Sequence, residues 1–239
     1  MKHYWINIDS CIDRKEFMEQ QFAQHGIQHE RISAETPDTM KSYSIIRHVE
    51  CKSTPAEICC ILSHLKALQK GYDDGEEFFC VAEDDVNIPK LDFVKIKQYI
   101  KDAEERDNTN VEMLQLFTSG YPYIIDMLNQ YATNHQYVVR REQCCPATVY
   151  YMATRTGAKK LLDMFKIGKD KYDLSYSAWT AADNILYKPI NTYIVSYPLT
   201  TTNIDYGSII HMEHIGNHQS ANLLINHIHR ANNLMHLFT

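Results

Sequence analysis

The sequence predicts an α/β fold in which helices flank a central, mostly parallel β-sheet. Short apolar runs rich in β-formers alternate with segments of helical periodicity, and the first strand, helix and strand fit within about 30 residues, as in a βαβ unit. The chain has 239 residues, of which 44% are hydrophobic and 23% charged, so a large core needs neither disulfides nor a metal. No internal repeat or linker-like composition interrupts it, and we expect a single domain over residues 1–239.

The first βαβ unit is expected within residues 4–33. A buried strand is predicted over residues 4–8, and Asp13 followed by Glu16 predicts a capping box at the start of a helix. Gly26 suits the left-handed conformation that often ends a helix, and the second strand is expected over residues 29–33. These elements predict two parallel strands joined by one helix.

A long helix is predicted to begin after Thr54, which follows a polar stretch over residues 35–53 that we interpret as a loop. Thr54 and Glu57 form a capping box, a proline occupies the first turn, and Gly71 is expected to end the helix. The apolar positions with helical spacing are Ile58, Ile61, Leu62, Leu65 and Leu68. They predict a face that packs on the sheet, with His64 near the centre of the helix.

The rest of the chain continues the alternation less regularly. Predicted strands cover residues 77–82, 111–117, 147–153 and 192–197. Predicted helices cover residues 91–105, 156–165 and 179–187, a loop covers 172–176, and an amphipathic, His-rich tail covers 220–238. The pattern extends the sheet into the second half of the chain.

Composition and charge exclude several classes of protein. Lys and Arg total 24 against 30 Asp and Glu, a net charge of −6, and no basic run is present to bind nucleic acid. The longest apolar run is about five residues, too short for a membrane span, and the first residues lack the apolar core of a signal peptide. Seven cysteines without a C-x-x-C pair favour reduced core thiols. We therefore expect a soluble, cytoplasmic protein without a nucleic-acid partner.

Three carboxylates, Glu83, Asp84 and Asp85, directly follow the predicted strand over residues 77–82. In open parallel sheets ligands bind outside the carboxyl ends of the strands, and adjacent carboxylates repel one another unless a cation compensates. Mg²⁺ or Mn²⁺ is the natural partner because both prefer oxygen ligands, and Mg²⁺ commonly also contacts substrate phosphates. The alternative is a solvated turn in which an aspartate caps the next segment.

Five segments resemble, in order and spacing, the motifs of glycosyltransferase family 25, the lipooligosaccharide and collagen galactosyltransferase group. Residues 5–14 are similar to its "INLD…DR" start, residues 30–34 to its next strand, residues 56–65 to "GEIACxLSH", residues 79–86 to "ILEDDV", and residues 151–162 to "YxISxxGAxKLL". The last third departs from the pattern, since Ala181-Ala182-Asp183 stands where the family carries "PID".

The resemblance implies a GT-A-like, Rossmann-related fold and transfer of a sugar, a hexose such as galactose, from a nucleotide diphosphate donor to a glycan or glycoprotein acceptor with inversion. It implies that Asp85, with Glu83, holds Mn²⁺ or Mg²⁺, and that Glu83 or Asp84 faces the ribose. Residues 1–118 would bind the nucleotide sugar and the metal, and residues 119–239 the acceptor. The enzyme would then be peripheral to a membrane if its acceptor resides there.

Further residues have two interpretations each. Asn7 and Asp9 would line the nucleotide pocket with Arg14 near a phosphate, or they are a turn and a surface arginine. His64 is a substrate contact or a satisfied core histidine, and His211 completes the shell of the cation or belongs to a mobile tail. Four tyrosines would either stack on a sugar or base or pack within the protein: Tyr121, Tyr123, Tyr150 and Tyr151.

Asp183 is the candidate general base that deprotonates the acceptor hydroxyl, because it stands at the acidic position of the family's "PID". The alternative role is an N-cap for the short helix that follows. Two other functions remain open. One is a nucleotidyl- or phosphotransferase that uses the same carboxylates, and the other is a non-catalytic module that binds a nucleotide sugar.

Overall fold

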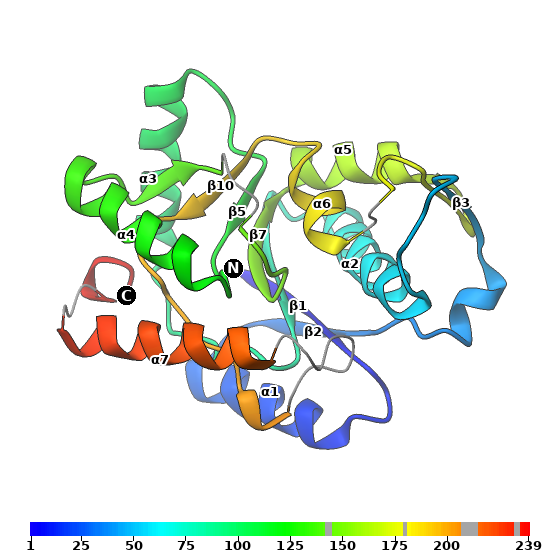
Figure 1. Ribbon diagram of the computed structural model, residues 1–239, viewed down its shortest axis with the longest axis horizontal. Coiled ribbons are helices and arrows are strands. Elements are labelled where there is room, and N and C mark those ends of the chain that lie inside the picture. The colour runs from blue at the N-terminus through cyan, green and yellow to red at the C-terminus, as the bar shows by residue number, and fades with distance from the viewer. Residues whose placement is uncertain (142–144, 179–180, 207–214, 232–234) are drawn as a thin grey trace.

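The computed structural model, which describes residues 1–141, 145–178, 181–206, 215–231 and 235–239, has an α/β architecture built on one large sheet (Figure 1). In these residues seven strands pair in the order β2-β1-β4-β7-β5-β10-β6. Their bounds are β1 (Lys2–Asn7), β2 (His29–Ser33), β4 (Phe78–Glu83), β5 (Met113–Gln115), β6 (Val138–Arg140), β7 (Tyr150–Thr154) and β10 (Thr192–Val195). A second, smaller sheet has the order β3-β9-β8, from β3 (Ser44–Arg47), β8 (Lys166–Gly168) and β9 (Lys171–Leu174).

The large sheet is mostly parallel, as predicted. β1 is parallel to both β2 and β4, and β5 is parallel to β10. β7 lies between β4 and β5 and is antiparallel to both, so β4 and β5 share one direction, while β6 is antiparallel at the edge. The carboxyl ends of β1 and β4 therefore meet at one edge of the sheet. This arrangement is consistent with a GT-A-like fold.

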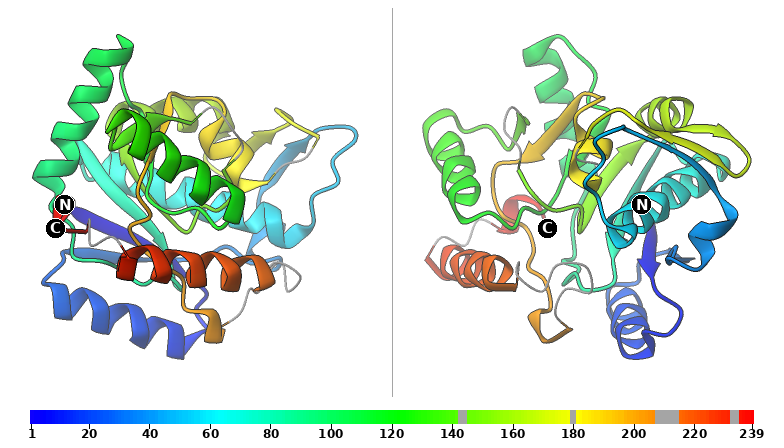
Figure 2. Two further views of the ribbon diagram at one scale, coloured as in Figure 1. Left: turned by 60° about the vertical axis from the view of Figure 1, so that its left-hand side comes forward. Right: turned by 45° about the vertical axis from the view of Figure 1, so that its right-hand side comes forward.

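Helices cover both faces of the large sheet (Figures 1 and 2). They are α1 (Ile12–His25), α2 (Pro55–Asp73), α3 (Phe93–Asp107), α4 (Tyr121–Asn134), α5 (Arg155–Phe165), α6 (Ala182–Tyr187) and α7 (Ile215–Ala231), with 3₁₀ turns at Thr39–Ser42, Ile204–Tyr206 and Met235–Leu237. One apolar cluster joins α1, α3, α4 and α7 to one face, and a second joins α2, α5 and α6 to the other. Alternation along β1 supplies both, since Trp5 enters the first cluster and Tyr4 and Ile6 the second.

The caps of the first two helices agree only in part with the prediction. Thr54 and Glu57 form the expected capping box, in which the Glu57 amide donates to Thr54 Oγ1 at 3.2 Å and the Glu57 carboxylate accepts from the Thr54 amide at 2.7 Å. Gly26 ends α1 with φ +63°, also as expected. The capping box at Asp13 is wrong, because α1 begins at Ile12 and Asp13 lies within its first turn.

Gly71 does not end α2, which continues to Asp73. The glycine instead allows close packing, because a Cβ at this position would lie 2.5 Å from the ring of Phe79 on β4. α2 can therefore approach the sheet closely next to the strand that carries the acidic triplet.

Several predicted elements need correction. The stretch over residues 35–53 is not all loop, since it contains β3, and the expected loop over 172–176 overlaps β9, with which β3 pairs in parallel. α4 and β6 were not predicted at all. No helix in the parts of the chain that the structure describes combines the length and hydropathy needed to cross a membrane.

Candidate active site at the carboxyl ends of β1 and β4

The acidic triplet lies where β4 ends and is enclosed by three other segments. Ile6 of β1 pairs with Glu83, so the end of β1 lies beside it. The amide of Glu83 donates to the carbonyl of Val149, which brings in the loop before β7. On the far side Val86 forms an isolated antiparallel bridge with Thr202. The site is thus assembled from segments that are distant in the sequence.

Asp84 is buried and has protein partners for both carboxylate oxygens. Arg14 Nη1 on α1 lies 2.8 Å from Asp84 Oδ1 in an ion pair, and Asn7 Nδ2 donates to Oδ2 at 2.7 Å. Arg14 is itself buried and donates through Nη2 to the carbonyl of Tyr206 at 3.0 Å. The interpretation of Arg14 as a surface residue is therefore wrong. These contacts connect β1, α1 and β4 at the edge of the sheet.

Asp9 is exposed and lies two residues after the end of β1. It accepts a hydrogen bond from Ser33 Oγ at 2.9 Å and pairs with Arg31, which lowers the pKa of its carboxyl. Arg31 also donates through Nε to Asn7 Oδ1 at 2.9 Å. Sequence reasoning missed Arg31 as a site residue, although the alternation of β2 beside β1 was a usable signal.

Glu83 is held by two neighbours. Thr148 Oγ1 donates to its Oε1 at 2.7 Å, and His64 Nε2 lies 3.3 Å from the same oxygen. Burial favours a higher pKa for Glu83, but the hydrogen bond and charge of His64 and the hydroxyl of Thr148 outweigh it and hold the pKa below its ordinary value. Glu83 is therefore an ionised carboxylate directed at α2.

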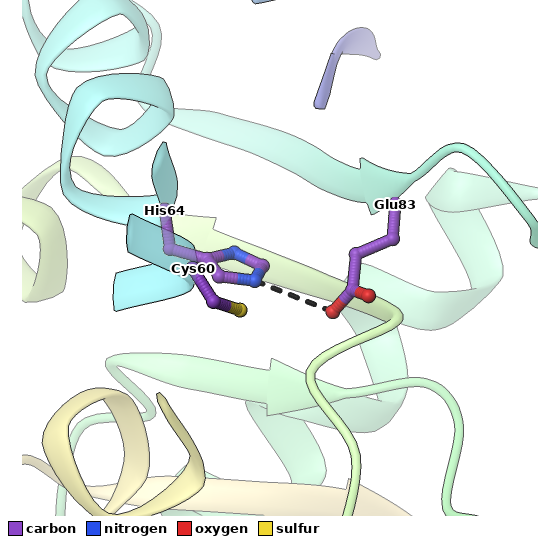
Figure 3. Close-up of side chains that lie close together, drawn as sticks. All are labelled: Cys60, His64 and Glu83. Atoms are coloured by element: carbon purple, nitrogen blue, oxygen red, sulfur yellow. Dashed lines mark hydrogen bonds and ion pairs between the residues drawn. The ribbon is translucent and has the colours of Figure 1, made fainter. Parts of the chain in front are cut away.

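His64 combines both roles that the sequence left open. It is almost completely buried, at 1% exposure, and its Nδ1 lies 3.1 Å from the hydroxyl of Tyr151, so it is a satisfied core histidine. It also contacts the acidic triplet through Glu83 (Figure 3). Cys60, one turn earlier on α2, joins the same group, and sequence reasoning missed it although the i, i+4 spacing was visible.

Asp85 differs from its two neighbours in its hydrogen bonding. Its Oδ1 is buried and has no hydrogen-bond partner in the described residues. Burial, and then the charges of Glu83 and Asp84, raise the pKa of Asp85 to about 8. A hard divalent cation fits here, because it would satisfy the orphaned oxygen and offset the repulsion. The structure thus supports Asp85 as the strongest candidate for a cation ligand.

Asp183 lies in the first turn of α6, whose N-cap is Ala181, so the capping role is wrong. The amide of Ala147 donates to Asp183 Oδ2 at 3.3 Å. Burial raises the pKa of Asp183, and among the charges that act on it are those of Glu83 and His64. Asp183 therefore contacts the loop that precedes β7 and lies near Glu83 of the acidic triplet.

A cleft of about 750 Å³ opens between the start of α4 and α7. Its lining includes Tyr121, Tyr123, Pro146, Leu223 and His227. Pro146 directly precedes Ala147, so the cleft borders the loop that contacts Asp183. Tyr121 is half exposed, whereas Tyr150 and Tyr151 are fully buried and belong to the core. His211 lies outside the described residues.

The model of glycosyltransferase family 25, described as LPS biosynthesis protein, matches residues 1–176, which include the acidic triplet, α2 and β7. No curated protein matches the chain at a significant level.

Proposed function

This chain belongs to glycosyltransferase family 25, and from that premise we propose that it transfers a hexose from a nucleoside diphosphate sugar to a glycan or glycoprotein with the aid of a divalent cation. Membership makes it a glycosyltransferase that uses a nucleotide-sugar donor. The observation that carries the metal-dependent part is the buried Oδ1 of Asp85, which has no hydrogen-bond partner among the described residues and lies beside two further carboxylates.

In this proposal Asp85 is the main ligand of Mn²⁺ or Mg²⁺, and Glu83 and His211 are the further ligands. When bound, the cation would neutralise the charge that develops on the departing diphosphate. The raised pKa of Asp85 supports this assignment, because a carboxylate whose ionisation is costly gains most from a nearby positive charge.

The donor is proposed to lie against residues 1–118. Asp84, tied to Asn7 and Arg14, keeps the turn after β1 in one position beside the cation site. Asp9 and Arg31 pair near the end of β1, where they are available to the ribose and phosphates of the donor. A nucleotide held by this rigid edge would need little reorganisation before reaction.

Asp183 is the proposed general base. The acceptor hydroxyl oxygen attacks the anomeric carbon, the bond from that carbon to the diphosphate oxygen breaks, and the hydroxyl proton passes to the Asp183 carboxylate. A single displacement of this kind inverts the anomeric centre. The raised pKa of Asp183 supports the role, because a stronger base accepts a proton more readily near neutral pH.

The acceptor is proposed to enter through the cleft between α4 and α7. Its lining combines aromatic rings with polar side chains such as Asn217 and Ser220, a composition suited to sugar rings and their hydroxyls. The galactose identity of the donor sugar rests on the family resemblance. It and a cytoplasmic location stand as parts of the same proposal.

A panel of nucleotide sugars tests this function. We expect one donor to raise the melting temperature more in the presence of Mn²⁺ than the separate effects of donor and Mn²⁺ predict, because both ligands share the diphosphate. Mass analysis of products should show addition of a hexose to an acceptor. Addition of a phosphate or nucleotide would indicate a phospho- or nucleotidyltransferase instead. Tight donor binding without turnover would indicate a binding module.

A further inference from the structure

A second group of metal-ligating side chains lies on the α2 side of Glu83. Cys60 and His64, four residues apart on α2, project from the same side of the helix toward Glu83 at the end of β4 (Figure 3). One ligand atom from each of the three residues lies within 4.8 Å of the others. Nε2 of His64 and Oε1 of Glu83 are only 3.3 Å apart.

We propose that Cys60, His64 and Glu83 form a binding site for a thiophilic divalent cation such as Zn²⁺. A thiolate, an imidazole and a carboxylate are the ligands that zinc takes, and three protein ligands would leave a fourth position for water. Mg²⁺ and Mn²⁺ prefer oxygen ligands, so this site differs in chemistry from the one proposed at Asp85.

The neighbours of the ligands favour metal binding. A zinc-bound histidine usually hydrogen-bonds through its other ring nitrogen, and His64 Nδ1 is already 3.1 Å from the Tyr151 hydroxyl. When a cation binds, Nε2 would release the proton that it donates to Glu83, and the proton on Nδ1 would then donate to the Tyr151 hydroxyl. The Thr148 hydroxyl holds the Glu83 carboxylate in turn, at 2.7 Å. Both outer partners therefore orient the ligands before any ion arrives.

Two of the three ligands keep partial exposure to solvent. Cys60 and Glu83 are half-buried, while His64 is buried between them and the core. Burial raises the pKa of the Cys60 thiol, so the thiol carries its proton when no cation is bound, and that proton passes to solvent when the thiolate ligates.

One consequence rests on the proposed function. Glu83 belongs both to this site and to the proposed site of the catalytic cation. An ion held by Cys60 and His64 would draw the Glu83 carboxylate away from Asp85, so Zn²⁺ would inhibit sugar transfer.

Titration with Co²⁺, a spectroscopic substitute for Zn²⁺, tests the binding site directly. We expect wild type to bind Co²⁺ with a thiolate-to-cobalt charge-transfer band and the intense visible absorption of a tetrahedral ion, both displaced by Zn²⁺. Cys60→Ser should lose the charge-transfer band and bind at least about 100-fold more weakly, since loss of even an outer partner of a ligand costs about 10–100-fold. Cys59→Ser is the matched control, because Cys59 contacts Met40 Sδ and lies outside the group.

Two results would overturn the site: wild type without tetrahedral Co²⁺, or a Cys60→Ser protein with an unchanged charge-transfer band. X-ray absorption of Zn²⁺-loaded wild type needs no variant and should show one sulfur near about 2.3 Å with nitrogen and oxygen near about 2.0–2.1 Å. Zinc inhibition is measured separately, and it should weaken in Cys60→Ser but not in Cys59→Ser. Co²⁺ binding without sugar transfer would reject the proposed function and leave the metal site standing.

Discussion

Glu83 and Asp183 contact consecutive residues of one loop. The hydroxyl of Thr148 donates a hydrogen bond to the Glu83 carboxylate, and the amide of Ala147 donates one to the Asp183 carboxylate. Ala147 has a φ of +91°, a conformation that non-glycine residues rarely adopt, and its carbonyl accepts from the Tyr187 hydroxyl at 3.2 Å. The loop before β7 therefore fixes how the proposed metal-ligating carboxylate and the proposed base lie relative to each other.

Asp85→Asn should abolish the effect of Mn²⁺ on both melting temperature and activity. Loss of a charged ligand removes an electrostatic element that typically contributes about 10²–10³ in rate. The metal-free fold should be as stable as wild type or more so, because the substitution removes the cost of burying this carboxylate and its repulsion with Glu83 and Asp84. Asp38→Asn, an exposed carboxylate paired with Lys41, is the control. Unaltered Mn²⁺-dependent activity in Asp85→Asn would exclude Asp85 as a ligand.

Asp183→Asn should lower kcat by about 10²-fold or more while donor and metal affinity stay near wild type, because the amide cannot accept the acceptor proton. Steady-state kinetics with varied acceptor and donor, together with donor binding, measure this. Asp163→Asn, in an exposed pair with Lys159 on α5, should have no effect. A variant with near wild-type turnover, under conditions where chemistry limits the rate, would remove Asp183 from the mechanism.

Tyr121→Ala should raise the KM for the acceptor by about 2- to 10-fold, since a lost ring contact is worth about 0.5–1.5 kcal/mol. The KM for the donor should not change, because the cleft lies on the α7 side of the loop before β7. Tyr176→Ala removes a similarly exposed ring that packs on Phe165 and serves as the control. Equal changes in both KM values would argue against an acceptor site in the cleft.

Arg14→Met should destabilise the fold by about 3–5 kcal/mol, because it leaves the buried Asp84 carboxylate without its ionic partner. Chemical denaturation gives the free energy of unfolding. Lys15→Met alters an exposed i, i+4 pair with Glu19 at 3.8 Å, which should contribute at most about 0.5 kcal/mol. Similar losses in the two variants would mean that the Arg14–Asp84 pair does not stabilise the fold.

The free energy of unfolding should decrease as the pH is lowered below about 6.5. His3 should account for part of this dependence on pH. Burial lowers the pKa of His3 to about 3, and its Nε2 lies 2.8 Å from the Tyr150 hydroxyl. Because the pKa is lower in the folded state, the stabilisation is complete above the unfolded value of 6.5 and is lost toward pH 3, by about 1.4 kcal/mol per pH unit. His3→Gln should remove this part of the slope in denaturation measured at several pH values. His227→Gln, on an exposed position of α7, should retain it.

Local signals account for the elements that the sequence predicted well. α2 carries its capping box and its apolar face within one segment, and β4 reads as a buried strand because both of its faces are covered. β3 and β9 were missed because β3 is short and mostly exposed, so its strand conformation depends on a partner more than a hundred residues away. α4 has a proline in its first turn but no capping side chain, since its cap at Gly120 makes no side-chain hydrogen bond, and it was missed.

The candidate site was likewise predictable only in part from the sequence. The acidic triplet was predictable because its three carboxylates are adjacent and follow a strand. The different roles of the three carboxylates were not, since Asp84 is paired by Arg14, Glu83 by His64, and Asp85 by neither, and these pairings depend on how α1 and α2 pack on the sheet. Cys60 joins the site through the packing of α2, and Arg31 joins it through the pairing of β2 with β1.

The position of β7 in the sheet has a consequence for how the chain is made. β2, β1 and β4 can pair as soon as they have been synthesised, but the open edge of β4 must wait for β7, which emerges about 70 residues later. At the ribosome's pace of about 5–20 residues per second, that edge stays unpaired for several seconds. Unpaired edges of apolar strands recruit other chains, so aggregation of nascent protein should be greatest in this interval and should decrease when residues 150–154 become available.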